Sequence, residues 1–168
     1  MFLMILISTL LLQPAPLYVI SPDFPNEGTI PVKFTCDGED VSPTLIVNGI
    51  PAGTQSMALF VEDPEAAVAN LTQWMVWNIP PVETIIEEGL SVDKELIVMK
   101  DSYRGPCPAM GETKRYTFKV YALDTILSLP AEANRNEVDQ AIEGHILATG
   151  QLLGEYSRSV VTGKKRKK

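Results

Sequence analysis

Asp63 is the side chain whose setting first suggests a functional site. It follows the apolar run Met57–Val61 and precedes Pro64, which has no backbone N–H and disfavours a helical conformation for the residue before it. The strand must therefore end near Asp63, and a rigid strand end can hold a carboxylate in the wall of a pocket. Alternatively, Asp63 only closes an Asp-Pro turn with its own backbone, and both interpretations stay open here.

Chemistry that needs histidine, cysteine or a nucleophile motif has little support in this sequence. The chain has one histidine, His145, and two cysteines, Cys36 and Cys107, whose spacing does not match a zinc site. A single histidine without a nucleophile motif nearby is more often structural than catalytic. The motifs Gly-x-Ser-x-Gly, His-Glu-x-x-His and Gly-x-x-x-x-Gly-Lys are missing. We therefore expect no enzyme, no metal and no cofactor.

Short strands separated by turns must position the remaining polar side chains. The 13 prolines and 11 glycines are scattered, and apolar runs return at short spacing without helices between them. The predicted strands are Leu17–Ile20, Pro31–Thr35, Thr44–Val47, Met57–Val61, Trp74–Ile79, Leu96–Met99, Lys114–Leu123 and Gln151–Tyr156. This pattern favours a mostly β fold, an antiparallel β-sandwich with a Greek-key-like arrangement and one or two short C-terminal helices.

The run Lys114–Leu123 is the clearest strand of the chain. Its residues alternate between two faces, of which one is formed by Tyr116, Phe118, Val120 and Ala122. The loop before it, Asp101–Gly111, is dense in proline and glycine. Such a loop is stiff, so it can shape a site at the start of the strand.

One segment, Asn136–Ala148, has the residue spacing of a helix. The residues of its apolar face recur at intervals of three and four: Val138, Ala141, Ile142 and His145. Asn134 or Asn136 can cap its start, and Gly150 can end it. The spacing thus predicts that His145 lies on a helix face.

The two ends of the chain differ in composition from its body, residues 17–160, which we expect to form one domain of the 168-residue chain. Residues 1–16 form an apolar leader that resembles the apolar region of a secretory signal peptide and is too short to span a bilayer comfortably. It predicts export to the periplasm or the medium; the alternative is a cytoplasmic protein in which the leader is an edge strand or an anchor. Residues 161–168 form a basic tail, expected to be disordered.

The net charge of the chain argues against broad nucleic-acid binding. Its formal value of −7 includes five positive charges in the tail Lys164–Lys168, so the rest of the chain carries −12. An acidic surface repels the phosphate backbone. We therefore expect no nucleic-acid partner for the domain.

Six short motifs follow one another in a fixed order between Ile20 and Arg158. They are Phe34–Asp40 with Ser42-Pro43, Asp63–Ala66, Trp74–Pro80, Gly105–Pro108 with Arg115-Tyr116, Gly144–Ala148 and Gly154–Arg158. Together they resemble the motifs of the phosphatidylethanolamine-binding protein family, in its prokaryotic Raf-kinase-inhibitor-like branch. The resemblance covers nearly the whole body of the chain.

This resemblance implies a β-sandwich with a small anion-binding pocket at one end. In the family, the pocket takes phosphate-like groups, including phospholipid headgroups, and most members are binding or regulatory proteins. The matching positions of this chain are Asp63, Gln73, Gly105, Pro106, Lys114 and Tyr116. The resemblance therefore implies a non-catalytic protein that binds a small anion or a phospholipid headgroup. It also places Cys36 and Cys107 in loops around the pocket, where export would favour a disulfide.

Two of these positions depart from the family pattern, because Gln73 and Lys114 stand where the family has its pocket histidines. Gln73 can still donate and accept hydrogen bonds, and Lys114 offers a fixed positive charge to a phosphate. Such a pocket would hold an anion without a group that titrates near neutral pH. Alternatively, Lys114 points to solvent and the pocket is vestigial, in a regulatory module that inhibits a kinase or protease. A homodimer is a further candidate assembly.

Overall fold

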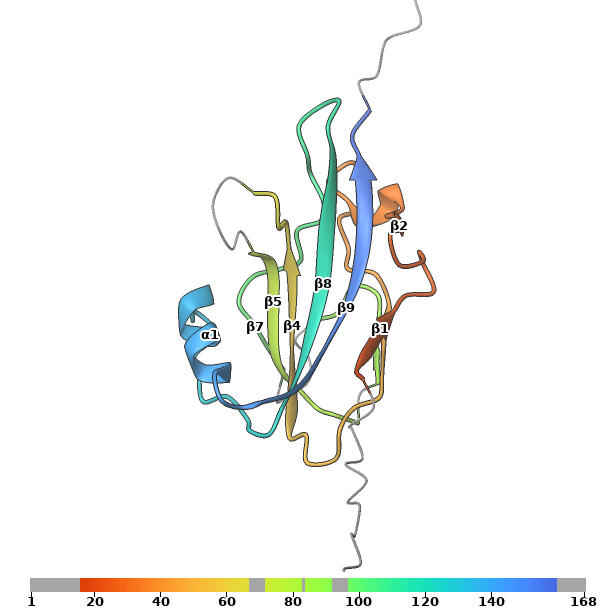
Figure 1. The fold of residues 1–168 in the computed structure, drawn as a ribbon. Helices are drawn as coiled ribbons and strands as arrows, with labels where there is room; N and C mark the ends of the chain where they lie inside the picture. Colours follow the sequence, from red (N-terminus) through yellow and green to blue (C-terminus); the bar gives the residue numbers. More distant parts are fainter. Residues whose placement is uncertain (1–15, 67–71, 83, 92–96, 160–168) are drawn as a thin grey trace, which may run out of the picture.

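Two β-sheets and one short helix make up the computed structural model, which describes residues 16–66, 72–82, 84–91 and 97–159. The small sheet has the order β1 (Tyr18–Ile20), β3 (Leu45–Asn48) and β6 (Ile85–Ile86). The large sheet has the order β2 (Gly28–Thr29), β9 (Ile146–Ser157), β8 (Thr113–Leu123), β4 (Ser56–Glu62), β5 (Thr72–Ile79) and β7 (Val98–Met99) (Figure 1). The mostly β fold predicted from the sequence is confirmed.

Four strands of the large sheet can be compared with the Greek-key-like arrangement that the sequence predicts. β4, β5 and β7 are antiparallel neighbours, and β8 returns to pair with β4 on its free side. The resulting order β8-β4-β5-β7 resembles a Greek key, with β6 of the small sheet between β5 and β7 in the chain. One pairing is parallel, between the two residues of β2 and Gly154–Glu155 of β9.

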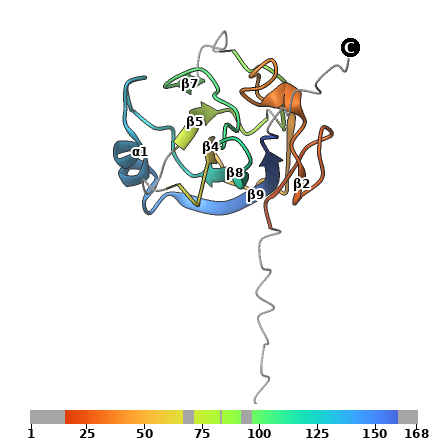
Figure 2. The same ribbon diagram turned by 90° about the horizontal axis from the view of Figure 1, so that it is seen from above.

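One face of the large sheet is buried against the small sheet, and part of the other face is buried against the helix. The face of β8 predicted to be apolar, with Tyr116 and Phe118, packs into the core between the two sheets. On the opposite face, Phe60 and Trp77 pack with Val138 of the helix α1 (Arg135–Ile142). Figure 2 shows α1 on the side of the large sheet away from β2. This double burial fixes the register of the strands, because a slip by one residue would exchange the two faces.

The helix is shorter than predicted, and this removes His145 from it. Asn134 caps α1 through the backbone N–H of Glu137, and the helix ends at Ile142. Gly144 then adopts a φ of 80°, which a helix cannot continue. Residues Ile146–Ala148, predicted to be helical, instead begin β9 and pair with β8. Strand pairing there overrides the helical spacing of the sequence.

Another local prediction was wrong at Pro31–Thr35, where the structure has a 3-10 helix over Val32–Phe34 instead of a strand. Pro31 has no N–H for a strand ladder, and the Thr35 hydroxyl donates to the carbonyl of Val32 at 2.8 Å.

The predicted leader and tail lie outside the described residues, apart from Pro16, as does Leu96 at the start of a predicted strand. Within the described ranges, no helix has the length and apolar character needed to cross a membrane.

Candidate functional site

The ends of three neighbouring strands bring the predicted site residues together. Glu62, the last residue of β4, pairs with Thr72 of β5 on one side and with Thr117 of β8 on the other. Asp63 follows Glu62 directly, so it lies at the level of Tyr116 on β8 and within reach of Lys114. Gln73 lies at the bulge of β5 that faces the end of β4. Strands that are central in the sheet hold these side chains on rigid backbone.

The carboxylate of Asp63 forms an ion pair with Lys114. The Lys114 Nζ donates to Asp63 Oδ2 at 2.7 Å, and the carboxylate side chain is 3% exposed while that of Lys114 is 26% exposed. The other oxygen, Oδ1, accepts from the backbone N–H of Glu65 at 2.9 Å. Asp63 thus closes its Asp-Pro turn and also pairs with a cation, while its place in the wall of a pocket stays a prediction.

Gln73 and Tyr116 hold the inner side of the loop Tyr103–Pro108. With its amide nitrogen turned toward the loop, Gln73 donates to the carbonyls of Arg104 at 2.8 Å and Gly105 at 3.0 Å. Burial, and then the charge of Asp63, raise the pKa of Tyr116 to about 12, while a hydrogen bond with the Cys107 backbone opposes this shift. The Gln73 amide therefore positions the loop.

The outer side of the same loop packs against the turn that follows the 3-10 helix. The Gly105 N–H donates to Asp40 Oδ1 at 2.6 Å, and the Tyr103 hydroxyl donates to the carbonyl of Phe34 at 3.0 Å. A Cβ on Gly105 would lie 2.2 Å from the Phe34 carbonyl oxygen. Only glycine allows this approach, which explains the residue type in the Gly-Pro-Cys-Pro motif. Pro106 also contributes, since its carbonyl accepts from the Cys36 N–H at 3.3 Å.

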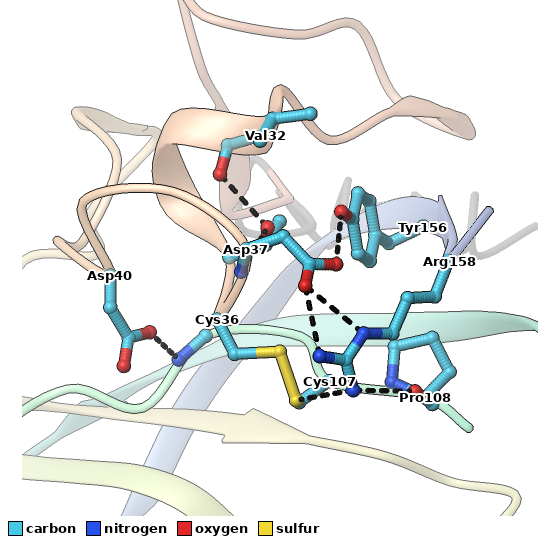
Figure 3. Close-up of a disulfide and its surroundings, with 10 residues drawn as sticks. Val32, Cys36, Asp37, Asp40, Cys107, Pro108, Tyr156 and Arg158 are labelled. Carbon is cyan, nitrogen blue, oxygen red and sulfur yellow. Dashed lines mark hydrogen bonds and ion pairs between the residues drawn. A yellow bond between two sulfur atoms is a disulfide. The ribbon is translucent and has the colours of Figure 1, made fainter. Parts of the chain in front are cut away.

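A disulfide between Cys36 and Cys107 joins this turn to the loop (Figure 3). Asp37, next to Cys36, accepts from the Tyr156 hydroxyl at 2.8 Å and pairs with Arg158. Both partners lower the pKa of Asp37, the Tyr156 hydrogen bond most strongly. Sequence reasoning did not place these three side chains at the site, although the motifs Phe34–Asp40 and Gly154–Arg158 contain them.

His145 is far from this cluster along the sheet. Its Nδ1 lies 2.7 Å from Asp124 Oδ1 on the surface. It precedes β9 at the end of the β8–β9 ladder where Leu123 pairs with Ile146, whereas Lys114 pairs with Tyr156 near the other end. In the described segments, no three His, Cys, Asp or Glu side chains gather as metal ligands.

Comparison with known proteins decides the family. The family profile described as phosphatidylethanolamine-binding protein matches residues 20–157. The chain belongs to this family. A UPF0098 protein of Pyrococcus horikoshii is 41% identical over 151 residues, covering 83% of this chain and 76% of the relative.

Solved structures of the phosphatidylethanolamine-binding protein family share the fold. A homologue from Chlamydia trachomatis superposes with a TM-score of 0.78 and 30% identity, over 85% of this chain and 98% of the other. YbcL of E. coli, described as a member of the mammalian family, gives a TM-score of 0.77 and 25% identity, over 85% and 99%. The whole described domain is therefore the family fold.

Alkaline pH should destabilise this member of the family through three site residues: Lys114, Tyr116 and Tyr103, whose pKa is strongly raised by burial. The hydrogen bond to Asp63 raises the pKa of Lys114 above its ordinary value of 10.5, and that of Tyr116 rises to about 12. Above about pH 10 the folded chain therefore binds more protons than the unfolded chain, so its stability falls as the pH rises. We expect the free energy of unfolding in urea to be flat between about pH 7 and 9 and to decrease beyond pH 10.

The contribution of Tyr116 can be separated by substitution. Tyr116→Phe should weaken the decrease above pH 10, whereas Tyr18→Phe, at a tyrosine that is 57% exposed, is the matched control. An identical pH profile for Tyr116→Phe and the wild type would contradict this assignment.

Proposed function

We propose that this chain is a non-catalytic binding protein whose site around Lys114 holds a phosphate group, either free or in a phospholipid headgroup. The observation that carries the proposal is the environment of the Lys114 ammonium. It is partly exposed at the ends of three strands, and its bond to Asp63 uses one of its three N–H donors. Donor capacity therefore remains for a second anion that enters from solvent.

The pairing with Asp63 favours a zwitterion over inorganic phosphate. An anion that binds Lys114 must compete with a carboxylate already 2.7 Å from Nζ. A phosphoethanolamine group can instead give its phosphate to Lys114 and its ammonium to Asp63, so that both charges remain paired. A buried carboxylate without a partner would be costly, and we therefore expect phosphoethanolamine to bind more tightly than phosphate.

Two substitutions at the family's histidine positions support a role without catalysis. Gln73 does not titrate, and its amide is engaged with the carbonyls of Arg104 and Gly105. The raised pKa of Lys114 keeps it protonated at neutral pH. Neither residue can act as a general base under these conditions.

Charge reversal at Lys114 tests the proposal. At a ligand concentration about 100 times the Kd, binding should raise the Tm by roughly 5–10 °C. We expect this rise with phosphoethanolamine, a smaller one with phosphate, and none with either ligand in Lys114→Glu. The measurement is a thermal-shift titration of the purified protein.

Lys119→Glu is the matched control, because it makes the same charge change on the same strand. Lys119 is also partly buried and lies with its Nζ 5.0 Å from the centre of the Tyr121 ring, on the other face of β8. This variant should keep the ligand-induced rise in Tm. A rise that persists in Lys114→Glu, or that is missing in the wild type, would overturn the proposal.

A regulatory protein-interaction module is the second candidate. Without a ligand, Asp63 already neutralises the charge of Lys114, and the loop carbonyls already engage the Gln73 amide. A groove of about 600 Å³ also lies beside the disulfide, and its lining includes Val32 and Met110, which are 54% and 56% exposed. If this candidate is right, inhibition of a kinase or protease should survive Lys114→Glu and be lost in Met110→Glu.

Export is the setting that we propose for this function. A disulfide persists in oxidising compartments and is rare in a reducing cytosol. The Cys36–Cys107 bond therefore supports the export predicted from the leader. Fractionation of cells that express the full chain tests it, and a chain found only in the cytosol with free thiols would contradict it.

A further inference from the structure

We infer that the Cys36–Cys107 disulfide sets the anion affinity of the site around Lys114, so that the oxidised chain binds tightly and the reduced chain binds weakly. The inference rests on the proposed function and adds a redox control to it. It follows from the position of the loop Tyr103–Pro108, which is shared by the site and by the disulfide.

The inner side of this loop forms part of the site. Gln73 holds the carbonyls of Arg104 and Gly105, and the backbone of Cys107 lies close enough to the Tyr116 hydroxyl to lower its pKa. The residues that carry these contacts flank Asp63 and Lys114 on β5 and β8. A displacement of the loop therefore moves one wall of the site.

The outer side of the loop is held by the turn Cys36–Asp40. Gly105 donates to Asp40, the N–H of Cys36 donates to Pro106, and Arg158 spans from Asp37 to the carbonyl of Pro108 at 3.4 Å. Figure 3 shows the contacts of Arg158 with Asp37 and Pro108 beside the sulfur atoms. The disulfide is the one covalent link in this set of contacts.

The noncovalent contacts alone should hold the loop less firmly. Asp37 and Asp40 are exposed, and the side chains of the Arg158–Asp37 pair are 27% and 31% exposed. Exposed ion pairs contribute little and open readily in water. Since the apparent affinity of a site falls with the fraction of time for which it is correctly formed, we expect reduction to weaken anion binding about five- to tenfold.

The surroundings of the disulfide suit reversible thiol–disulfide exchange. Cys107 is exposed and Cys36 is partly exposed, so small thiols reach the bond. The guanidinium of Arg158 lies 3.4 Å from Cys107 Sγ. A neighbouring cation stabilises a thiolate, which is the species that attacks and leaves in exchange.

A small disulfide compound can serve as the oxidant that forms the Cys36–Cys107 bond from two thiols. The Cys107 thiolate attacks one sulfur of the oxidant and releases its other sulfur as a thiolate. Cys36, deprotonated in turn, attacks Cys107 Sγ of this mixed disulfide and displaces the second oxidant thiolate. The two cysteines lose two electrons and two protons, and the oxidant gains them as a dithiol. A chain that is exported in the reduced form would thereby acquire tight binding on oxidation.

The test compares phosphoethanolamine binding by the oxidised full chain, by the chain kept in dithiothreitol, and by Cys36→Ser/Cys107→Ser. Calorimetric titration should give a five- to tenfold weaker Kd for the reduced chain and for the double variant. Reoxidation should restore the original Kd, and dithiothreitol should leave the Kd of the double variant unchanged. Equal Kd values for the oxidised and reduced wild type would overturn the inference.

Hydrogen exchange separates this inference from the proposed function. The Gly105 N–H, bonded to Asp40, should exchange faster after reduction whether or not an anion binds. If the oxidised chain binds no anion, the proposed function fails, and with it the redox control of binding. If the anion binds but reduction changes neither its Kd nor the exchange at Gly105, the redox inference alone fails.

Discussion

Replacing Cys36 and Cys107 together by serine is expected to lower the free energy of unfolding by about 4 kcal/mol and the Tm by roughly 10 °C. The two cysteines are 71 residues apart, so their bond restricts nearly half of the unfolded chain. Its removal returns that conformational freedom to the unfolded state. The native state should change little away from the loop, because its sheets do not depend on this link. Urea unfolding and thermal melts measure both quantities.

Reduction of the wild type provides the control for this prediction. Dithiothreitol should lower the Tm of the wild type to that of the double variant and leave the variant itself unchanged. A Tm of the double variant within about 2 °C of the oxidised wild type would correspond to well under 2 kcal/mol. That outcome would show that the disulfide does not stabilise the fold as described.

The second large effect is expected for Arg135→Ala, which should lower the free energy of unfolding by about 3 kcal/mol. Arg135 is only 16% exposed and pairs with Glu62, which is 20% exposed, and with Asp139 of its own helix. Its guanidinium also lies 4.3 Å from the centre of the Phe60 ring. Alanine would leave the Glu62 carboxylate largely buried without its cation, which is the costly way to break such a pair. Chemical denaturation measures the difference.

Arg115→Ala is the matched control for Arg135→Ala. Arg115 is 63% exposed, and its partner Glu155, at 3.5 Å, is 46% exposed. An exposed pair of this kind contributes less than about 1 kcal/mol. Equal losses of stability in the two variants would contradict the view that Arg135 fastens α1 to the end of β4 next to Asp63.

The strands that build the site could be predicted because their sequence pattern agrees with their packing. In Lys114–Leu123 one face carries Tyr116, Phe118, Val120 and Ala122, and this face meets the small sheet in the core. Pro64 correctly marks the end of β4. The helix end at Ile142 was missed because the spacing of His145 and Ile146 continued the helical period, while pairing with β8 decided their conformation.

The contacts of the site depend on long-range register, which local sequence does not encode. Lys114 and Asp63 are 51 residues apart, and they meet only because β4 and β8 are neighbours in one register. The resemblance to the family indicated the positions of these two residues, yet it did not indicate that they pair with each other. The same holds for Asp37 and Arg158, 121 residues apart, on the two sides of the disulfide.

The proposed site would respond to pH differently from one built with histidines, because Gln73 and Lys114 provide its polar side chains. A histidine gains its charge near pH 6.5, whereas the raised pKa of Lys114 keeps its charge fixed across the neutral range. Gln73 donates hydrogen bonds to the loop and carries no charge. Anion binding here should therefore depend on the redox state of the loop and not on neutral pH.

A crystal soaked in sodium selenate tests the central claim most directly, because selenium can be located by its anomalous scattering. Selenate carries the same tetrahedral arrangement of oxygens as phosphate and stays ionised at neutral pH. The account predicts an anomalous peak whose oxygens lie within hydrogen-bond distance of Lys114 Nζ, next to the loop Tyr103–Pro108, and no such peak in Lys114→Glu. Selenate found only elsewhere on the surface, with the Lys114–Asp63 pair undisturbed, would contradict it.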